Sequence, residues 1–418
     1  MKIAVIGAGI SGLAIAHILK QKHEVIVFEA DARPGGLIKC DYVDHSLFHR
    51  TGRHVFNTKR KDVADWFWQH FDREKEFTKA LRNSVIAMPD GKEIPYPIEN
   101  HLYLLDENTQ KCVIDDLLHM SSSAAEPPHN FEEFLRKRFG DTLYRLYFHP
   151  YNTKIWRRPL NKVPLEWLEG KLPMPTAAEI VYNNINHVKE QTFVHSSFYY
   201  PRQGGSQFIA DRLSQGLNIR YNSAVNRMEQ NKGKWIINEE TFDKVVFCGN
   251  IKQLPTMLNG HTAIRLYADR IDRLESHGTT TVFCEISPNP YSWIYLPDGQ
   301  HASHRIICTG NFSPANNSPV NNHPTERLTA SIEFTDRIEK EEILENLAKM
   351  PYCPRYLTHH YEQYTYPIQD KDTKAAIASL KNELRQAGIY LLGRFAEWEY
   401  YNMDVAIGAA LDMEKEFA

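Results

Sequence analysis

The chain has 418 residues, of which 42% are hydrophobic and 24% are charged. This is the composition of a globular protein that is long enough for two or three domains. The net charge of -3 argues against a dedicated nucleic-acid binder. Because no window holds about eighteen uninterrupted apolar residues, a transmembrane segment is not expected. We expect a cytoplasmic protein whose six cysteines are reduced and buried.

The first motif is a glycine-rich turn directly after an apolar strand. Residues 1–12 read MKIAVIGAGISG, which places Gly7, Gly9 and Gly12 in the spacing G-x-G-x-x-G. The first glycine allows a tight turn, the second lets a pyrophosphate approach the backbone, and the third lets the following helix pack on the strand. That helix, expected at 13–20, directs its N-terminal N–H groups at the phosphates. The motif therefore predicts a dinucleotide site.

A second strand is expected at 24–28 and is followed by Glu29. An acidic residue at this distance can accept the ribose hydroxyls of an adenosine, which favours an unphosphorylated ribose over that of NADP. A second glycine turn, Gly35 and Gly36, follows a few residues later, where FAD proteins bring backbone toward the cofactor. A secretory signal fits the N-terminal residues poorly because glycines interrupt the apolar run.

The rest of the chain changes its pattern several times. Residues 101–190 show helical periodicity, and a helix at 206–215 with short strands follows. Residues 262–368 alternate β-branched and aromatic residues with turns, as is typical of an antiparallel sheet. A final strand at 389–392 precedes a closing helix at 402–411, whose N-terminus is a further dipole for a cofactor.

Common catalytic signatures are absent from the sequence. There is no G-x-S-x-G, no H-E-x-x-H and no P-loop. The cysteines form no C-x-x-C pair, so neither a zinc site nor another metal site is predicted. If the protein is an enzyme, we expect its cofactor to supply the reactive atom.

A series of sequence blocks in chain order resembles one known family. The blocks are GAGISG with Glu29, PGG at 34–36, GRHVF at 52–56, PYPIENHL at 95–102, HPYNTKIWRRPL at 149–160, FYYPRQGG at 198–205, SWIYLP at 292–297, NFSPANN at 311–317 and GRFAEWEYYNMD at 393–404. Together they resemble the UDP-galactopyranose mutases and the mutase-like flavoproteins often labelled amine or protoporphyrinogen oxidases. The Y-N-x-K-x-W and G-R-F-A-E-x-x-Y-Y blocks are the most specific.

The resemblance implies an α/β fold of the glutathione-reductase and amine-oxidase type. A Rossmann-like FAD-binding domain carries an inserted helical domain and an antiparallel β-sheet domain. The predicted bounds are 1–80 with 198–255 and 385–418 for the discontinuous FAD-binding domain, 81–197 for the helical domain, and 256–384 for the sheet domain.

The resemblance also implies a reaction. Reduced FAD attacks the anomeric carbon of a nucleotide sugar, expected to be UDP-linked, through its N5 atom and displaces the nucleoside diphosphate. The sugar ring opens and recloses, which interconverts pyranose and furanose forms without net oxidation. In such a reaction the cofactor performs covalent catalysis, while the protein positions the leaving group and stabilises its charge.

Position by position, the resemblance assigns roles to single residues. Arg305 would clamp the substrate pyrophosphate, for which a guanidinium is well shaped, and Arg394 would lie beside the flavin. The catalytic residues implied are His54, Arg305, Tyr366 and Tyr400. The cofactor-binding residues implied are Gly7, Gly9, Gly12, Glu29, Gly35, Gly36, Arg394 and Met403. The substrate-binding residues implied are Tyr151, Trp156, Lys171, Arg305, Tyr366, Tyr400 and Asn402.

The sequence departs from the family at several of these positions. Lys171 stands where the mutases carry an arginine. A lysine keeps the positive charge but lacks the bidentate fork of a guanidinium. Asn402 stands where the family has an acidic residue, and Asn57 stands where it has a second histidine. Glu99 stands where the family has a neutral residue, at a position expected near the nucleotide base. Two alternatives stay open: an amine- or protoporphyrinogen-type oxidase, and a flavin- or nucleotide-sugar-binding protein without turnover. The identity of the sugar and of the nucleotide base also stays open. So does the oligomeric state, for which a homo-oligomer is one of the options.

Overall fold

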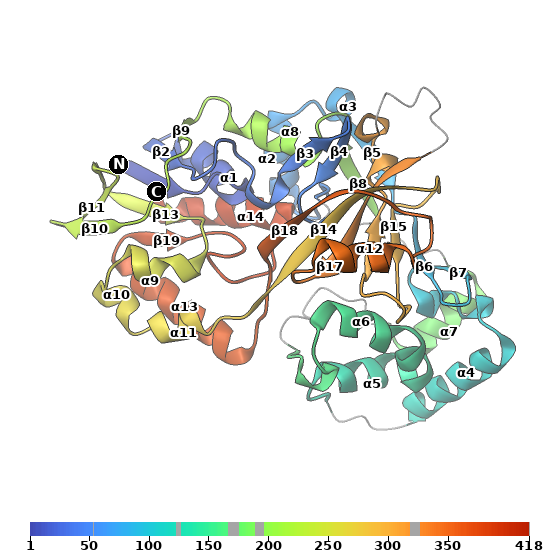
Figure 1. The fold of residues 1–418 in the computed structure, drawn as a ribbon. Helices are drawn as coiled ribbons and strands as arrows, with labels where there is room; N and C mark the ends of the chain where they lie inside the picture. The colour runs from blue at the N-terminus through green and yellow to red at the C-terminus, as the bar shows by residue number, and fades with distance from the viewer. Residues whose placement is uncertain (53, 123–126, 166–174, 189–195, 318–326, 418) are drawn as a thin grey trace.

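The computed structural model describes residues 1–52, 54–122, 127–165, 175–188, 196–317 and 327–417 (Figure 1). Its first layer is a parallel sheet in the strand order β19-β13-β1-β2-β9. Segments from both ends and from the middle of the chain therefore lie side by side. The strands are β1 (Lys2–Ile6), β2 (Glu24–Phe28), β9 (Asn218–Arg220), β13 (Lys244–Phe247) and β19 (Ile389–Leu391).

One face of this sheet packs against helices. Because side chains alternate along a strand, Val5, Val27 and Val246 point to the same side and join one hydrophobic core. This core buries the apolar side chains of the helices that cover the face. They are α1 (Ile10–Leu19), α2 (Lys61–His70), α8 (Gly205–Ser214) and α14 (Met403–Met413).

The opposite face has a second core, to which Ile6, Phe28 and Phe247 contribute. A small antiparallel sheet and four helices cover it. They are β10 (Met228–Asn231), β11 (Lys234–Ile237), β12 (Glu240–Phe242), α9 (Leu254–Met257), α10 (Thr262–Arg265), α11 (Ala268–Asp272) and α13 (Lys371–Gln386).

A larger sheet lies beside this layer, in the strand order β18-β14-β17-β16-β15-β6-β7 (Figure 1). All neighbouring strands are antiparallel except β15 and β6. Helix α12 packs on the core of one of its faces. The bounds are β6 (Ser84–Ala87), β7 (Glu93–Pro95), β14 (Ser276–Ile286), β15 (Trp293–Tyr295), β16 (Arg305–Ile307), β17 (Leu328–Thr335), β18 (Arg355–Pro367) and α12 (Lys340–Leu347).

A helical region adjoins the β6–β7 end of the larger sheet, and two short strand pairs complete the fold (Figure 1). Buried aromatic side chains such as Phe131 and Tyr147 join the helices and the sheet in one core. The helices are α4 (Glu107–Ser122), α5 (Phe131–Leu143), α6 (His149–Trp156) and α7 (Ala177–Ile185), with a π-helical turn at Tyr144–Phe148. The strand pairs are β3 (Cys40–Val43) with β4 (Ser46–His49), and β5 (Phe77–Leu81) with β8 (Ser197–Pro201).

The α/β class and the Rossmann-like sheet agree with the sequence prediction. Among the described residues, no helix is both long and apolar enough to cross a membrane. Cys112 and Cys353 are exposed, which corrects the expectation that every cysteine is buried. Helix α13 falls in the range predicted for the sheet domain but packs on the five-stranded sheet. The predicted domain bounds stay a prediction.

The core between α2 and the parallel sheet yields a stability prediction. Phe67 is fully buried, and its ring stacks on that of Phe56 with centroids 3.6 Å apart. We expect Phe67→Ala to lower the free energy of unfolding by about 3–5 kcal/mol, because a cavity replaces the ring. Chemical denaturation measures this loss. The exposed Gln69→Ala on the same helix should change it by less than about 0.5 kcal/mol; similar effects of both variants would contradict the prediction.

Candidate active site

The glycine turn between β1 and α1 has the geometry expected of a cofactor cradle. Gly7 has a φ of 102° and donates its N–H to the Phe28 carbonyl at 2.8 Å. A Cβ at Gly12 would lie 1.9 Å from the Gly7 oxygen, so no side chain fits there. A Cβ at Gly9 would meet no atom within 4 Å, so it would project into open space. The open side at Gly9 is where a pyrophosphate can approach the backbone.

Glu29 lies directly after β2 and supports this turn. Its side chain is 8% exposed, and its carboxylate accepts hydrogen bonds from the Ala8 N–H at 2.7 Å and the Asp31 N–H at 3.0 Å. Each carboxylate oxygen can accept more than one hydrogen bond. Glu29 therefore holds the protein's own backbone, and its predicted contact with a ribose stays a prediction.

The second glycine turn packs against the first. Gly35 donates its N–H to the Ala8 carbonyl at 2.9 Å, and a Cβ at Gly36 would lie 3.3 Å from the Gly9 Cα. Gly35 and Gly36 have φ angles of 128° and 53°, in the region that favours glycine. The sequence therefore needs glycine here for both backbone conformation and close approach.

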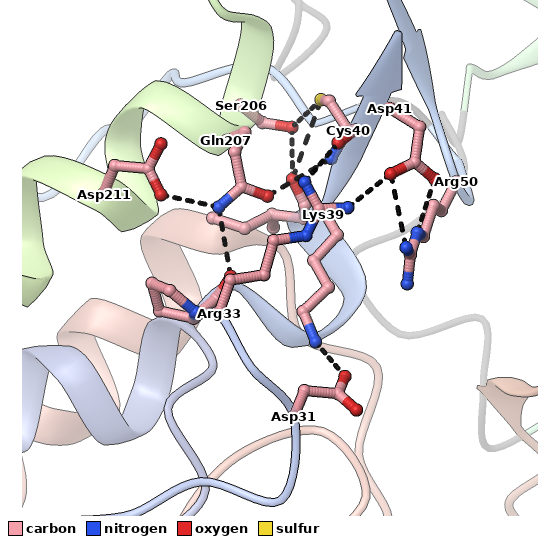
Figure 2. Close-up of polar contacts among 11 residues, drawn as sticks. Asp31, Arg33, Lys39, Cys40, Asp41, Arg50, Ser206, Gln207 and Asp211 are labelled. Carbon is pink, nitrogen blue, oxygen red and sulfur yellow. Dashed lines mark hydrogen bonds and ion pairs between the residues drawn. The ribbon is translucent and has the colours of Figure 1, made fainter. Parts of the chain in front are cut away.

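Polar contacts fasten the second turn to its surroundings (Figure 2). Lys39 forms an ion pair with Asp31, and the Gln207 amide donates to the Pro34 carbonyl at 3.1 Å. The Ser206 hydroxyl donates to the Ile38 carbonyl at 2.7 Å. The contacts of Gln207 and Ser206 come from the start of α8, so a helix remote in the sequence helps to hold the turn in place.

A pocket with about 590 Å³ of empty space, part of it open to solvent, lies between the two sheets. Four chain segments far apart in the sequence form its wall. Seven of the predicted site residues line it, namely His54, Arg305, Tyr366, Arg394, Tyr400, Asn402 and Met403, together with Thr51, Gly52, Val55 and Thr365.

Arg305 begins β16 and is paired in register with Glu333 on β17. Its Nε forms an ion pair with the Glu333 carboxylate, which is not exposed at all, and its Nη2 donates to the Tyr366 hydroxyl at 3.0 Å. His304 Nε2 lies 3.5 Å from the same carboxylate. Burial alone would raise the pKa of Glu333, but Arg305 and His304 outweigh it and hold that pKa well below its usual range.

Arg394 follows the turn at Gly393 and is held by backbone carbonyls. Its guanidinium donates to the Tyr401 carbonyl through Nε at 3.1 Å and through Nη2, and to the Thr365 carbonyl through Nη1 at 3.1 Å. The guanidinium carbon lies 4.9 Å from the centre of the Tyr400 ring. No ion pair joins Arg394 to a carboxylate within the described part of the chain, so its positive charge faces the pocket uncompensated.

Tyr366 and Tyr400 form one aromatic wall. Their rings stack with centroids 5.7 Å apart and planes 11° from parallel. Burial raises the pKa of Tyr366, so its hydroxyl stays protonated and able to donate at neutral pH. The two arginines and the two hydroxyl groups together form a site that suits an anionic group.

His54 brings an uncharged ring into the same pocket. Burial, followed by the nearby His49 and Arg394, lowers the pKa of His54 to about 3. The imidazole is therefore neutral at physiological pH. Its Nε2 atom is buried and has no hydrogen-bond partner among the described residues. Such an atom fits a bound heteroaromatic ring that offers a donor or an acceptor.

Asn402 and Met403 begin the closing helix α14. Asn402 occupies the N-cap position, but its side chain makes no cap hydrogen bond and lines the pocket instead. The helix therefore presents its first N–H groups and an amide in place of the carboxylate expected from the family. No negative charge is added to the pocket at this position.

Two other predicted substrate residues, Tyr151 and Trp156, do not line the pocket. Tyr151 stacks on Tyr147 with ring centroids 5.3 Å apart and lies edge-on to Tyr295. Trp156 is 8% exposed and belongs to the core of the helical region. Lys171 lies outside the described residues. The substrate contacts assigned to these three side chains stay predictions.

The lysine of the Y-N-x-K-x-W block has a structural position that the sequence did not reveal. Lys154 donates its ammonium to the carbonyls of Leu296 at 2.8 Å and Ser303 at 2.9 Å. Helix α6 is thereby tied to the segment that leads into Arg305. Burial lowers the pKa of Lys154 to about 7.

Comparison with known proteins gives the class of fold. A family model described as an NAD(P)-binding Rossmann-like domain matches residues 5–71. The crystal structure of a reduced UDP-galactopyranose mutase superposes with a TM-score of 0.85 at 22% identity, covering 100% of this chain and 96% of that chain. That of a putative protoporphyrinogen oxidase from Exiguobacterium superposes with a TM-score of 0.75 at 16% identity, covering 100% and 98%. The fold is that of the flavoproteins that include these two groups.

One relative found by sequence is similar over nearly the whole chain. The UDP-galactopyranose mutase of Mycoplasma pneumoniae is 24% identical over 438 residues, which cover 97% of this chain and 94% of that protein. The resemblance expected from the sequence is thus confirmed, with oxidases among the more distant relatives. The fold and its relatives imply a flavin cofactor.

The contrast between Gly9 and Gly12 tests the cofactor cradle. Gly9 has a φ of -73°, so Gly9→Ala should leave the melting temperature of the flavin-free protein unchanged. Its methyl group would occupy the space for a pyrophosphate and should weaken flavin binding by about 1–3 kcal/mol. Gly12→Ala should lower the melting temperature itself. Flavin content and thermal unfolding measure the two effects; unchanged flavin content in Gly9→Ala would place the pyrophosphate elsewhere.

The buried Glu333 yields a prediction with a pH dependence. Glu333→Gln should lower the free energy of unfolding at pH 7 by about 3 kcal/mol, because Arg305 loses its charged partner. The native pKa of Glu333 lies well below the ordinary glutamate value of 4.5, so its ionisation stabilises the fold above that pH.

The loss caused by Glu333→Gln should therefore shrink as the pH falls below about 4.5, where the unfolded wild-type chain takes up a proton. Urea titrations between pH 3 and 7 measure it. The exposed Glu345→Gln is the matched control and should show no such trend. A loss that is independent of pH would contradict the charge-pairing role of Glu333.

Proposed function

We propose that this chain is an FAD-dependent mutase that interconverts the pyranose and furanose forms of a UDP-linked sugar. The observation that carries the proposal is that two arginines and two tyrosines line one pocket. They are Arg305, Arg394, Tyr366 and Tyr400. The likeness to UDP-galactopyranose mutases over nearly the whole chain supports it.

Several features of the structure fit FAD. The open side of Gly9 and the adjoining turn at Gly36 leave room for its pyrophosphate, and Glu29 can accept from its ribose. His54 Nε2 would supply a hydrogen bond to the flavin ring. When bound and reduced, the flavin supplies a nucleophilic nitrogen for displacement at the anomeric carbon.

The protein's contribution is the stabilisation of a departing diphosphate. The Nε of Arg305 forms an ion pair with Glu333, which fixes the side chain, while its terminal nitrogens lie toward the pocket. Arg394 adds a charge that no carboxylate cancels within the described residues. The hydroxyl groups of Tyr366 and Tyr400 can donate to phosphate oxygens. Fixed donors and charges of this kind stabilise a leaving group without reorganisation.

The same charges argue against the oxidase alternative for amines. A protonated amine would meet a pocket wall with a net positive potential, which opposes its binding. The amide of Asn402, where the family carries an acid, removes a group that could compensate. The oxidase alternative is tested directly by measuring oxygen consumption.

The test compares the purified holoenzyme under reducing and oxidising conditions. With dithionite we expect UDP-galactopyranose and UDP-galactofuranose to interconvert, as followed by chromatography, and in air we expect turnover to stop. Oxygen consumption with an amine or a porphyrinogen, without any response to UDP-sugars, would replace the proposal with the oxidase. UDP binding without turnover would identify a binding protein.

A matched pair of variants tests the diphosphate contact. Arg305→Lys keeps a positive charge but loses the fork, and we expect its affinity for UDP to fall by about tenfold or more, the loss of one charge-assisted hydrogen bond. Arg337→Lys, at an exposed ion pair with Glu339, should bind UDP as the wild type does. Calorimetry measures both. Equal affinities would show that Arg305 does not contact the diphosphate.

A further inference from the structure

A chain of buried polar side chains leads from the second glycine turn to a loop of the larger sheet. It joins Ser206 at the start of α8, His49 on β4, Tyr200 on β8 and Asn316 in the short turn Pro314–Asn316. All four residues are fully buried. A buried polar group is costly unless it is hydrogen-bonded, so the contacts within this chain keep its members in one geometry.

The hydrogen bonds of this chain follow one another without a gap. Ser206 Oγ lies 2.7 Å from the Ile38 carbonyl oxygen and 3.1 Å from His49 Nδ1. His49 Nε2 lies 2.7 Å from the Tyr200 hydroxyl oxygen. Asn316 Nδ2 lies 3.0 Å from the same oxygen. The four side chains therefore form a continuous path to the backbone of the second turn.

The position of each proton in the chain follows from groups that can only accept or only donate. A carbonyl oxygen only accepts, so Ser206 donates to Ile38, and the Ser206 oxygen then accepts from His49 Nδ1–H. A neutral imidazole has one N–H, so His49 Nε2 accepts from the Tyr200 hydroxyl. The Tyr200 oxygen is left to accept from the Asn316 amide. Every donor in the chain thus points toward the turn.

The two ends of the chain lie in different layers of the fold. At one end, the Ile38 carbonyl comes two residues after Gly36, which packs on Gly9 of the cofactor cradle. At the other end, the Asn316 amide also donates to the Thr309 carbonyl at 2.8 Å, in the loop between β16 and β17. The chain therefore connects the larger sheet to the backbone that surrounds the open side of Gly9.

The surrounding residues pack closely on this chain. A Cβ at Gly205 would lie 2.6 Å from the Leu47 side chain and 3.0 Å from both the Cys40 sulfur and the Tyr200 hydroxyl oxygen. Gly205 also has a φ of 56°, in the region that favours glycine. Glycine at this position thus lets α8 begin directly against the chain.

We propose that Ser206, His49, Tyr200 and Asn316 are positioning residues for the flavin, which hold the second glycine turn in place and couple it to the larger sheet. Hydrogen bonds in series strengthen one another, so the chain acts as a unit. None of the four residues lines the pocket between the two sheets. This role rests on the flavin cofactor that the fold and its relatives imply, and it does not require the mutase reaction.

The first test is the affinity for FAD, measured by equilibrium dialysis of the holoenzyme. Ser206→Ala should weaken FAD binding by about tenfold, the value of one buried hydrogen bond. Ser214→Ala is the matched control on the same helix, because its hydroxyl donates to the Asp211 carbonyl at the surface, and it should bind FAD as the wild type does. Unchanged affinity in Ser206→Ala would overturn the proposal, whatever the outcome with UDP-sugars.

Two further variants of Ser206 separate the hydroxyl group from its packing. Ser206→Thr keeps the hydroxyl, whereas Ser206→Val has a similar shape without it, so both variants share any change in packing. We expect the threonine variant to bind FAD about tenfold more tightly than the valine variant. Equal affinities would show that the hydroxyl does not position the turn and would overturn the proposal.

A double-mutant cycle tests whether the chain acts as a unit. Tyr200→Phe removes only a hydroxyl group and should weaken FAD binding by about tenfold. Tyr200 and Ser206 both act through His49, so the double variant should fall well short of the about hundredfold loss that independent effects would give. Losses that multiply in full would show two separate packing effects and would contradict the coupling.

The protonation of His49 supplies a spectroscopic test. Nitrogen-15 NMR of the histidine-labelled holoenzyme, assigned with His49→Asn, should show a neutral ring with its proton on Nδ1. Burial raises the pKa of the Cys40 thiol, but contacts with His49 and Ser206 lower it below its ordinary value, so the competing arrangement is a thiolate beside an imidazolium. An imidazolium, or a proton on Nε2, would overturn the direction of the chain and with it the proposal.

Discussion

The contact between Glu333 and Arg305 is the interaction on which the candidate site depends. A carboxylate with no exposure is costly unless a cation and hydrogen bonds satisfy it, and the neighbouring strands β16 and β17 bring the two groups into register. The pair fixes the guanidinium, which in turn binds the Tyr366 hydroxyl. The position of one wall of the pocket thus follows from an ion pair inside the larger sheet.

The opposite wall depends on backbone groups. Arg394 is held by the carbonyls of Tyr401 and Thr365, which belong to different layers of the fold. A Cβ at Gly393 would lie 2.8 Å from the Ser11 hydroxyl at the start of α1, so this turn packs tightly on the glycine cradle. The cofactor cradle and the cationic pocket therefore both contact the short segment that begins at Gly393.

Much of the fold could be predicted from local patterns. The strand at 24–28 has the predicted bounds, and α1, α8 and α14 agree with the predicted helices to within a few residues, because glycine turns and apolar periodicity act over short distances. Seven predicted site residues meet in one pocket, and the resemblance to a family had brought them together. Glu333 was missed, since in S-I-E-F-T it reads as an ordinary residue of an alternating strand.

By itself, the sequence determined the glycine cradle, the class of fold and the residue types available to an anionic ligand. The tertiary structure alone decided which charges cancel: Glu333 pairs with Arg305, Arg394 contacts carbonyls, and His54 is neutral because it is buried. It also decided that Trp156 lies in a core. The physical reason is that burial and pairing arise between residues distant in the chain, where local spacing carries no information.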